Sequence, residues 1–171
     1  IDACHDVHIL SPTPGGTKGK SVLENVLVWF RRDLRSVDNT ALAEATRRAR
    51  RVFCVFLFDR EILDALDFKQ DRRVEFIRES LVELDQSLRE KGGNLIVRYG
   101  YPAEEIPHLA HALEVSAVFA NRDYEPQSKR RDLAVAKALR VVGINFESFK
   151  DQVVFEHPEV LSLSGRSFTV F

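Results

Sequence analysis

The sequence contains few cysteines and no methionine: among its 171 residues, only Cys4 and Cys54 carry a thiol. Two cysteines cannot build the disulfide framework of a small secreted protein, and Cys54 lies within an apolar run, so we expect a reducing, cytoplasmic setting. Cys4 has His5 and His8 nearby but no fourth ligand, and we predict no metal site. Long hydrophobic runs are also missing, since none approaches the ~20 residues that span a membrane. These absences argue against a disulfide-stabilised scaffold and against a membrane-spanning protein.

An excess of charge of one sign is missing as well. Lys and Arg number 25 and Asp and Glu number 26, which gives a net charge of -1. A domain that binds duplex DNA by itself usually carries a basic excess, so DNA binding would need a positive groove from a partner domain. The basic runs Arg47–Arg51 and Lys129–Arg131 fall on predicted helices. We interpret them as structural, because cations are favoured at helix ends and Asp132 offsets the second run.

The beginning of the sequence carries little regular pattern. Residues 1–24 include the Pro- and Gly-rich segment Ser11–Thr17, so we predict a flexible N-terminal extension followed by one domain over residues 25–171. The missing Met and the apolar end Ser167–Phe171 lead us to expect that the chain is a piece of a longer protein.

Short apolar runs alternate with amphipathic segments from residue 25 onward. The apolar runs predict five strands, over Val26–Phe30, Val52–Phe58, Leu95–Tyr99, Ala117–Ala120 and Ile144–Phe149. The amphipathic segments predict helices from Asp38 to about Arg50, and over Asp71–Lys91, Pro102–Glu114 and Pro126–Gly143. We therefore predict an α/β fold with a Rossmann-like or flavodoxin-like, doubly wound, five-stranded parallel sheet in the order 3-2-1-4-5 and helices on both faces. A barrel would need about eight such units.

Individual positions support these boundaries. Leu42, Ala45 and Ala49 should share the buried stripe of the first helix. Gly92 and Gly93 should end the longest helix, because glycine adopts the left-handed conformation that a helix end requires.

Charged side chains follow the first, second and fourth predicted strands. Arg31–Arg35 stands where a dinucleotide-binding fold would place its G-x-G-x-x-G turn, which argues against a standard NAD or FAD Rossmann site. Asp59–Glu61 and Asn121–Pro126 follow the other two strands, at the sheet edge where such folds bind ligands. The same charges could instead cap helices and pair with one another, as Glu125 could at a helix start. From spacing alone, a ligand site and a structural role are equally open.

Several segments, in order along the chain, resemble the photolyase and cryptochrome family. They are Leu27–Arg35 with Asp38-Asn39 and Ala41-Leu42, Phe58–Leu63, Gly100 with Pro102 and Ile106-Pro107, Asn121–Pro126 with Arg131-Asp132, and Gly165–Phe171. The resemblance covers about Val26 to Phe171, and it indicates the N-terminal α/β domain of that family.

The resemblance implies a function. Members of the family repair pyrimidine dimers in DNA with blue light, as deoxyribodipyrimidine photo-lyases, or signal light, as cryptochromes, using FAD held in a C-terminal helical domain. The N-terminal domain holds an antenna chromophore, which is a deazaflavin, a folate or a flavin, and which passes excitation energy to FAD. We expect no catalytic residue and no repair activity in this piece alone. Its expected partners are the helical domain and, through the intact protein, damaged DNA.

The resemblance to deazaflavin-type relatives also implies which side chains hold the chromophore. Carboxylates would accept hydrogen bonds from ring N–H or ribityl hydroxyl groups, an arginine would balance an anionic ring, and aromatic faces would stack on it. Arg72 is an alternative to its neighbour Arg73, and Gln127 stands where relatives often have an aromatic residue. The binding residues that we predict are Phe30, Arg31, Phe58, Asp59, Arg73, Asp123 and Glu125.

Two other functions stay open at the level of sequence. One is a cryptochrome-type blue-light photoreceptor domain. The other is a free-standing nucleotide-binding or electron-transfer α/β module that has kept only the fold.

Overall fold

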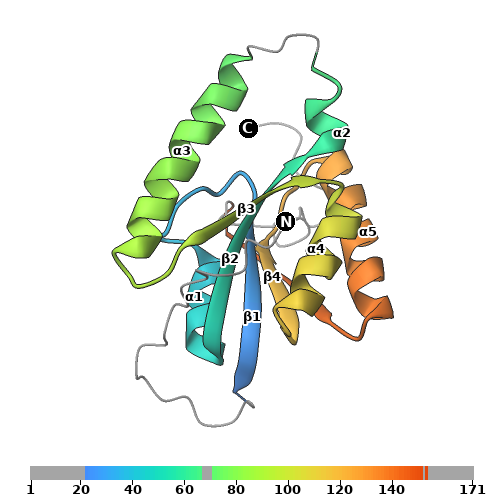
Figure 1. The fold of residues 1–171 in the computed structure, drawn as a ribbon. Coiled ribbons are helices and arrows are strands. Elements are labelled where there is room, and N and C mark those ends of the chain that lie inside the picture. The colour runs from blue at the N-terminus through green and yellow to red at the C-terminus, as the bar shows by residue number, and fades with distance from the viewer. Residues whose placement is uncertain (1–21, 67–70, 152, 154–171) are drawn as a thin grey trace, which may run out of the picture.

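Five parallel strands form the centre of the computed structural model, which describes residues 22–66, 71–151 and 153 (Figure 1). The strands are β1 (Leu23–Phe30), β2 (Ala49–Asp59), β3 (Leu95–Gly100), β4 (Ala117–Asn121) and β5 (Asn145–Phe149). The helices are α1 (Thr40–Arg48), α2 (Arg60–Leu63), α3 (Arg72–Arg89), α4 (Pro102–Ala112) and α5 (Pro126–Val141). The sheet order is β3-β2-β1-β4-β5, and this confirms the predicted fold class and strand order.

The sheet separates two hydrophobic cores. Helices α1 and α3 cover one face of the sheet, and α4 and α5 cover the other (Figure 1). On β1, the side chains of Val28 and Phe30 belong to the core under α1 and α3, while Leu27 and Trp29 belong to the core under α4 and α5. All four side chains are at most 2% exposed. A strand covered on both faces needs apolar residues at consecutive positions, which explains the unbroken apolar run in the sequence.

The first helix ends earlier than predicted. The side chain of Asn39 caps its start by accepting a hydrogen bond from the backbone N–H of Leu42 at 3.0 Å, but the helix stops at Arg48 rather than near Arg50. Ala49 has extended dihedral angles (φ -119°, ψ 152°) and pairs with Leu23 of β1. Ala49 is therefore buried in β2 and not on the helix stripe, because strand pairing begins directly after the last helical turn.

The long helix α3 has the predicted face and end. Leu81, Leu84 and Leu88 are buried against the sheet. Gly92 has the left-handed conformation (φ +82°), and the backbone N–H of Gly93 donates to the carbonyl oxygen of Leu88 at 2.9 Å. This confirms that the glycine pair ends the helix.

Some predicted features lie outside the described residues. These are most of the N-terminal extension, with Cys4 and its neighbouring histidines, and the terminal segment that resembles the family. β1 begins at Leu23, three residues before the predicted strand and within the predicted N-terminal extension. The one-turn helix α2 follows β2 without having been predicted. Within residues 22–66, 71–151 and 153, no helix has the length and apolar character to cross a membrane, and no group of three or more metal-binding side chains occurs.

Candidate functional site

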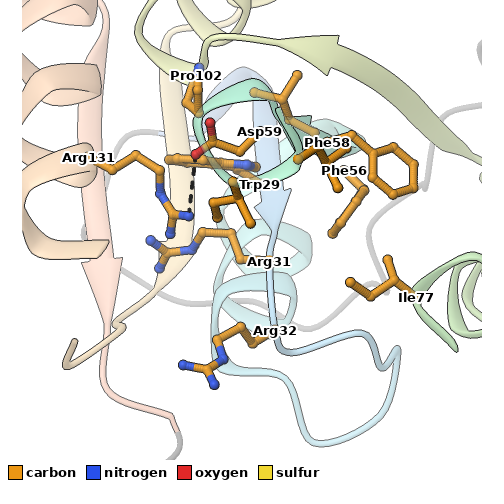
Figure 2. Close-up of a pocket in the computed structure, with 12 residues that line it drawn as sticks. Trp29, Arg31, Arg32, Phe56, Phe58, Asp59, Ile77, Pro102 and Arg131 are labelled. Carbon is orange, nitrogen blue, oxygen red and sulfur yellow. Dashed lines mark ion pairs between the residues drawn. The ribbon is translucent and has the colours of Figure 1, made fainter. Parts of the chain in front are cut away.

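A pocket of about 140 Å³ lies at the carboxyl ends of β1 and β2 (Figure 2). The chain moves outward from β1 in one direction through β2 and β3, and returns to the other side of β1 with β4, so the pocket adjoins the switch point where such sheets bind ligands. Both cores and the four helices α2, α3, α4 and α5 contribute to its wall. The lining residues are Trp29, Arg31, Arg32, Phe56, Leu57, Phe58, Asp59, Ile62, Leu63, Ile77, Pro102 and Arg131.

One side of the pocket is aromatic and aliphatic. The rings of Phe56 and Phe58 meet edge to face, with centroids 5.0 Å apart and an interplanar angle of 82°. Ile62 of α2 and Ile77 of α3 complete this side. Such a surface suits the apolar faces of a flat conjugated ring.

The other side of the pocket is cationic. The guanidinium carbons of Arg31 and Arg131 lie 5.1 and 5.3 Å from the centroid of the Trp29 ring, which is the geometry of a cation–π contact. Figure 2 shows both guanidinium groups on the side of the pocket away from Ile77. Arg32 also lines the pocket, and Asp59 is the one carboxylate among the lining residues.

Carboxylates contact the buried Arg31 at hydrogen-bond distance and the partly buried Arg131 only at longer ion-pair distance. Arg31 Nη1 donates to both carboxylate oxygens of Asp132 on α5, at 2.5 and 2.6 Å, and its side chain is 6% exposed. Arg131 lies 3.9 Å from Asp59 and 3.7 Å from Asp132, which are ion-pair distances too long for hydrogen bonds. Burial, together with the nearby charge of Arg31, lowers the pKa of the Arg131 guanidinium. Arg131 is thus a desolvated cation without a close carboxylate.

Asp59 both caps a helix and lines the pocket. Its carboxylate caps α2 by accepting a hydrogen bond from the backbone N–H of Glu61 at 3.0 Å. Burial raises the pKa of Asp59 above its ordinary value, although the hydrogen bond from Glu61 and the charge of Arg131 oppose the rise. Asp59 is therefore a partly desolvated acceptor at the wall of the pocket.

A buried polar network fixes the loop that carries the arginines. The carboxylate of Asp33 accepts hydrogen bonds from the backbone N–H of Arg31 at 2.9 Å and from the side-chain amides of Asn39 and Asn121 at 3.1 and 2.6 Å. The side-chain oxygen of Asn121 accepts the backbone N–H of Ala41 at 2.8 Å. Because Asn39 caps α1 and Asn121 ends β4, the network joins the ends of β1 and β4 to the start of α1.

The acidic residues after β4 lie beside the pocket rather than in its wall. Glu125 forms an ion pair with Arg32 at the surface and makes no capping hydrogen bond to α5, so the predicted pairing role holds and the capping role does not. Asp123 lies 4.0 Å from Arg32 and lines a neighbouring hollow of about 520 Å³ between α5 and β5. Burial opposes ionisation of Asp123, but hydrogen bonds from Ser128 and from the backbone of Glu125, with the nearby arginines, outweigh it and lower its pKa.

Two further predicted residues do not reach the pocket wall. Phe30 is fully buried and stands opposite Phe56 in the β1–β2 register, so it packs behind the lining. Arg73 has a side chain that is 76% exposed, and it donates to Asp71, the capping residue of α3. These hydrogen bonds lower the pKa of Asp71 to about 2. Arg73 lies one helical turn before Ile77, which does line the pocket.

The structure thus brings three predicted residues, Arg31, Phe58 and Asp59, to one pocket. Trp29 and Arg131 are not among the predicted residues, although they form its cationic side. Trp29 precedes Arg31 by two positions, and the period of a strand places such a pair on the same side of the sheet. The spacing from Arg31 could therefore have identified Trp29 as a pocket residue from the sequence.

Comparisons with known proteins identify the family to which the chain belongs. The family model described as DNA photolyase matches residues 26–171. The chain is similar to a deoxyribodipyrimidine photo-lyase from a Synechococcus species, with 36% identity over 146 residues that cover 85% of this chain and 30% of that protein. It is also similar to a cryptochrome DASH from Natronomonas pharaonis, with 34% identity over 143 residues that cover 81% of this chain and 30% of that protein. The chain therefore spans 30% of the length of these relatives.

Solved structures give the same result. A class III photolyase from Agrobacterium tumefaciens superposes with a TM-score of 0.75 at 27% identity, covering 92% of this chain and 32% of that one. An archaeal photolyase from Sulfolobus tokodaii superposes with a TM-score of 0.66 at 34% identity, covering 78% of this chain and 32% of that one. The latter structure contains two FAD molecules, which implicate a novel light-harvesting cofactor in that protein.

Proposed function

The chain belongs to the DNA photolyase family as an N-terminal domain of the photolyase and cryptochrome type, and from this premise we propose that its pocket binds an antenna chromophore. The observation that supports the proposal is the division of one pocket into an aromatic side and an arginine side, at the strand ends where doubly wound sheets bind ligands. A conjugated ring with polar substituents has both of the surfaces that this wall complements.

Each predicted binding residue has a role in the proposal. Phe58 contacts the face or edge of the ring, Asp59 accepts a hydrogen bond from a ring N–H or a ribityl hydroxyl group, and Arg31 balances negative charge. Phe30 supports the wall from within the core and Arg73 approaches the ligand at the mouth. Asp123 and Glu125 hold Arg32 in place beside it.

The proposal extends to the intact protein. We propose that the domain lies against a helical domain that holds FAD, and that the antenna chromophore passes excitation energy to this FAD in the cytoplasm of the cell. The activity proposed for the whole is light-driven repair of pyrimidine dimers in DNA. Light signalling is the second candidate, because cryptochromes are among the relatives. Repair of a thymine-dimer oligonucleotide under blue light by the intact, FAD-loaded protein separates the two, since a signalling protein would leave the dimer unchanged.

Excitation spectroscopy tests the antenna role. The intact protein is loaded in turn with a deazaflavin, a folate and a flavin, and the excitation spectrum of FAD emission or FAD photoreduction is recorded. A band of the added chromophore in that spectrum is the expected result for at least one of the three. If none of them transfers energy to FAD, the antenna proposal is wrong.

A matched pair of variants on α3 locates the chromophore. Ile77→Trp fills the apolar side of the pocket and should abolish the chromophore band. Val82→Trp adds the same side chain on the same helix at an exposed position outside the lining, and should leave the band intact. Equal loss in both variants, or in neither, would place the chromophore elsewhere.

A further inference from the structure

The cationic side of the pocket contains buried donors without acceptors. Within the part of the chain that the structure describes, Arg31 Nη2, Arg131 Nε, Arg131 Nη2 and Trp29 Nε1 are buried and make no hydrogen bond. All three residues line the same pocket, and the Arg31 side chain is 6% exposed. Buried donors are nearly always paired in folded proteins, so the three unpaired guanidinium nitrogens of Arg31 and Arg131 point to an acceptor that binds beside them.

The charges around these donors favour an acceptor that is negatively charged. Arg32 is occupied by Glu125, and Nη1 of Arg31 is occupied by Asp132. Arg131 has carboxylates at 3.9 and 3.7 Å but no hydrogen bond to either, and the charge of Arg31 acts against its own. An anionic oxygen placed between the two guanidinium groups would pair their free N–H groups and offset the repulsion between them.

Trp29 gives this arrangement its rigidity. Both guanidinium groups lie over its ring, and the ring itself is 2% exposed in the core under α4 and α5. Stacking on an indole limits the rotation of each guanidinium plane, so their donors are pre-positioned and lose little entropy when an anion binds.

From this geometry we infer that Arg31 and Arg131 form an anion subsite, which takes a phosphate or an ionised ring hydroxyl of the ligand while the ring contacts Phe58 and the apolar side. The inference rests on the proposed function for the identity of the ring, but the subsite itself can be tested without any ring. Arg131 is the residue to vary, because it makes no hydrogen bond to a carboxylate. Its substitution therefore breaks no such bond, which would otherwise destabilise the fold independently of anion binding.

The first arm uses inorganic phosphate as the probe. Thermal unfolding of the 171-residue chain is followed in phosphate and in chloride at equal ionic strength, for the wild type, Arg131→Gln and Arg130→Gln. Arg130 is the exposed neighbour on the same helix and serves as the matched control. Phosphate should raise Tm by at least about 2 °C in the wild type and in Arg130→Gln, and should have no such effect on Arg131→Gln.

The second arm uses three flavins that differ in one anionic group. Riboflavin is neutral, FMN adds a phosphate, and ionised 8-hydroxyriboflavin adds a ring oxyanion. Flavin fluorescence titrations should show one of the two anions binding to the wild type at least about tenfold more tightly than riboflavin, because charge-assisted hydrogen bonds supply that much. Preference for FMN identifies phosphate as the group, and preference for 8-hydroxyriboflavin identifies the ring oxygen. This arm needs no variant, so it stands even if Arg131→Gln does not fold.

The outcomes separate this inference from the antenna proposal. If phosphate does not stabilise the chain and the three flavins bind equally, the anion subsite is wrong while the pocket still binds a ring. If phosphate stabilises the chain through Arg131 and no antenna chromophore binds the intact protein, the subsite is real and the antenna proposal is wrong. If a buried water molecule were the missing acceptor, phosphate would not stabilise the chain and the three flavins would bind equally.

Discussion

Replacing Asn121 by alanine should destabilise the domain strongly, because the side chain is part of a buried polar network. Asn121 is 2% exposed at the end of β4, and its amide makes three hydrogen bonds. It donates to the carboxylate of Asp33 at 2.6 Å and to the side-chain oxygen of Asn39 at 3.0 Å, and it accepts from the backbone N–H of Ala41 at 2.8 Å.

The expected loss follows from the kinds of group left behind. A hydrogen bond to a charged acceptor is worth about 1.5–3 kcal/mol, and a buried N–H without an acceptor costs about 1–3 kcal/mol. Asn121→Ala removes the hydrogen bond to the charged carboxylate of Asp33 and leaves the buried N–H of Ala41 without an acceptor, so we expect a loss of about 3–5 kcal/mol in the free energy of unfolding. That is a large part of the roughly 5–15 kcal/mol by which most domains are stable.

Urea unfolding measures this loss. The emission of Trp29, the sole tryptophan of the chain, reports unfolding, and a loss of this size should lower the midpoint by about 1.5–2.5 M for a slope near 2 kcal/mol/M. Asn145→Ala at the exposed start of β5 is the matched control and should shift the midpoint little. A loss below about 1 kcal/mol in Asn121→Ala, or one equal to the control, would refute the role assigned to the network. The double variant with Asp33→Ala should lose less than the sum of the single variants, because the two side chains share a hydrogen bond.

Three further predictions concern other parts of the domain. Arg48→Gln breaks two hydrogen bonds to Glu147 that join α1 to β5, at 2.6 and 2.8 Å, and should cost about 1 kcal/mol in urea unfolding because the pair is partly exposed; an unchanged midpoint would contradict this. Burial raises the pKa of the Cys54 thiol to about 12, so in a Cys4→Ser background iodoacetamide should label Cys54 only as fast as the domain unfolds, and mass spectrometry showing faster labelling would disprove it. The pKa of Asp59 is higher in the folded domain than its ordinary value of 3.8. Protonated Asp59 therefore stabilises the folded state at pH values below 3.8, and this stabilisation is lost as the pH rises through the folded-state pKa. The free energy of unfolding of Asp59→Asn should therefore rise relative to that of the wild type as the pH rises through this range. A difference between the two proteins that does not change with pH would argue against the raised pKa.

The fold could be predicted because its signals are local. The run around Val28 is apolar at every position, as a strand buried on both faces requires, and Gly92 occurs where the periodic pattern of α3 stops. The boundary between α1 and β2 could not be predicted in the same way. Arg48, Ala49 and Arg50 all favour helix, and only the pairing of Ala49 with a strand from elsewhere in the chain ends it.

The candidate site was predictable in part. Arg31 and Asp59 follow strands directly, so the topology of a parallel sheet brings them to one edge. Arg131 resembles a surface cation within a basic run, but it follows the buried Ser128 by three positions and precedes the buried Val135 by four, which is the spacing of one helix face. Its stacking on Trp29 depends on how α5 is rotated against the sheet, and that rotation is set by contacts distant in the sequence.

The alternation along β1 divides two tasks between neighbouring residues. Val28 and Phe30 belong to the core that holds α1 and α3, while Trp29 and Arg31 line the pocket. A substitution at one set leaves the packing partners of the other unchanged. Substitutions at Arg31 can therefore change what the pocket wall presents while the core under α1 and α3 keeps its contacts, whereas substitutions at Trp29 also disturb the core under α4 and α5.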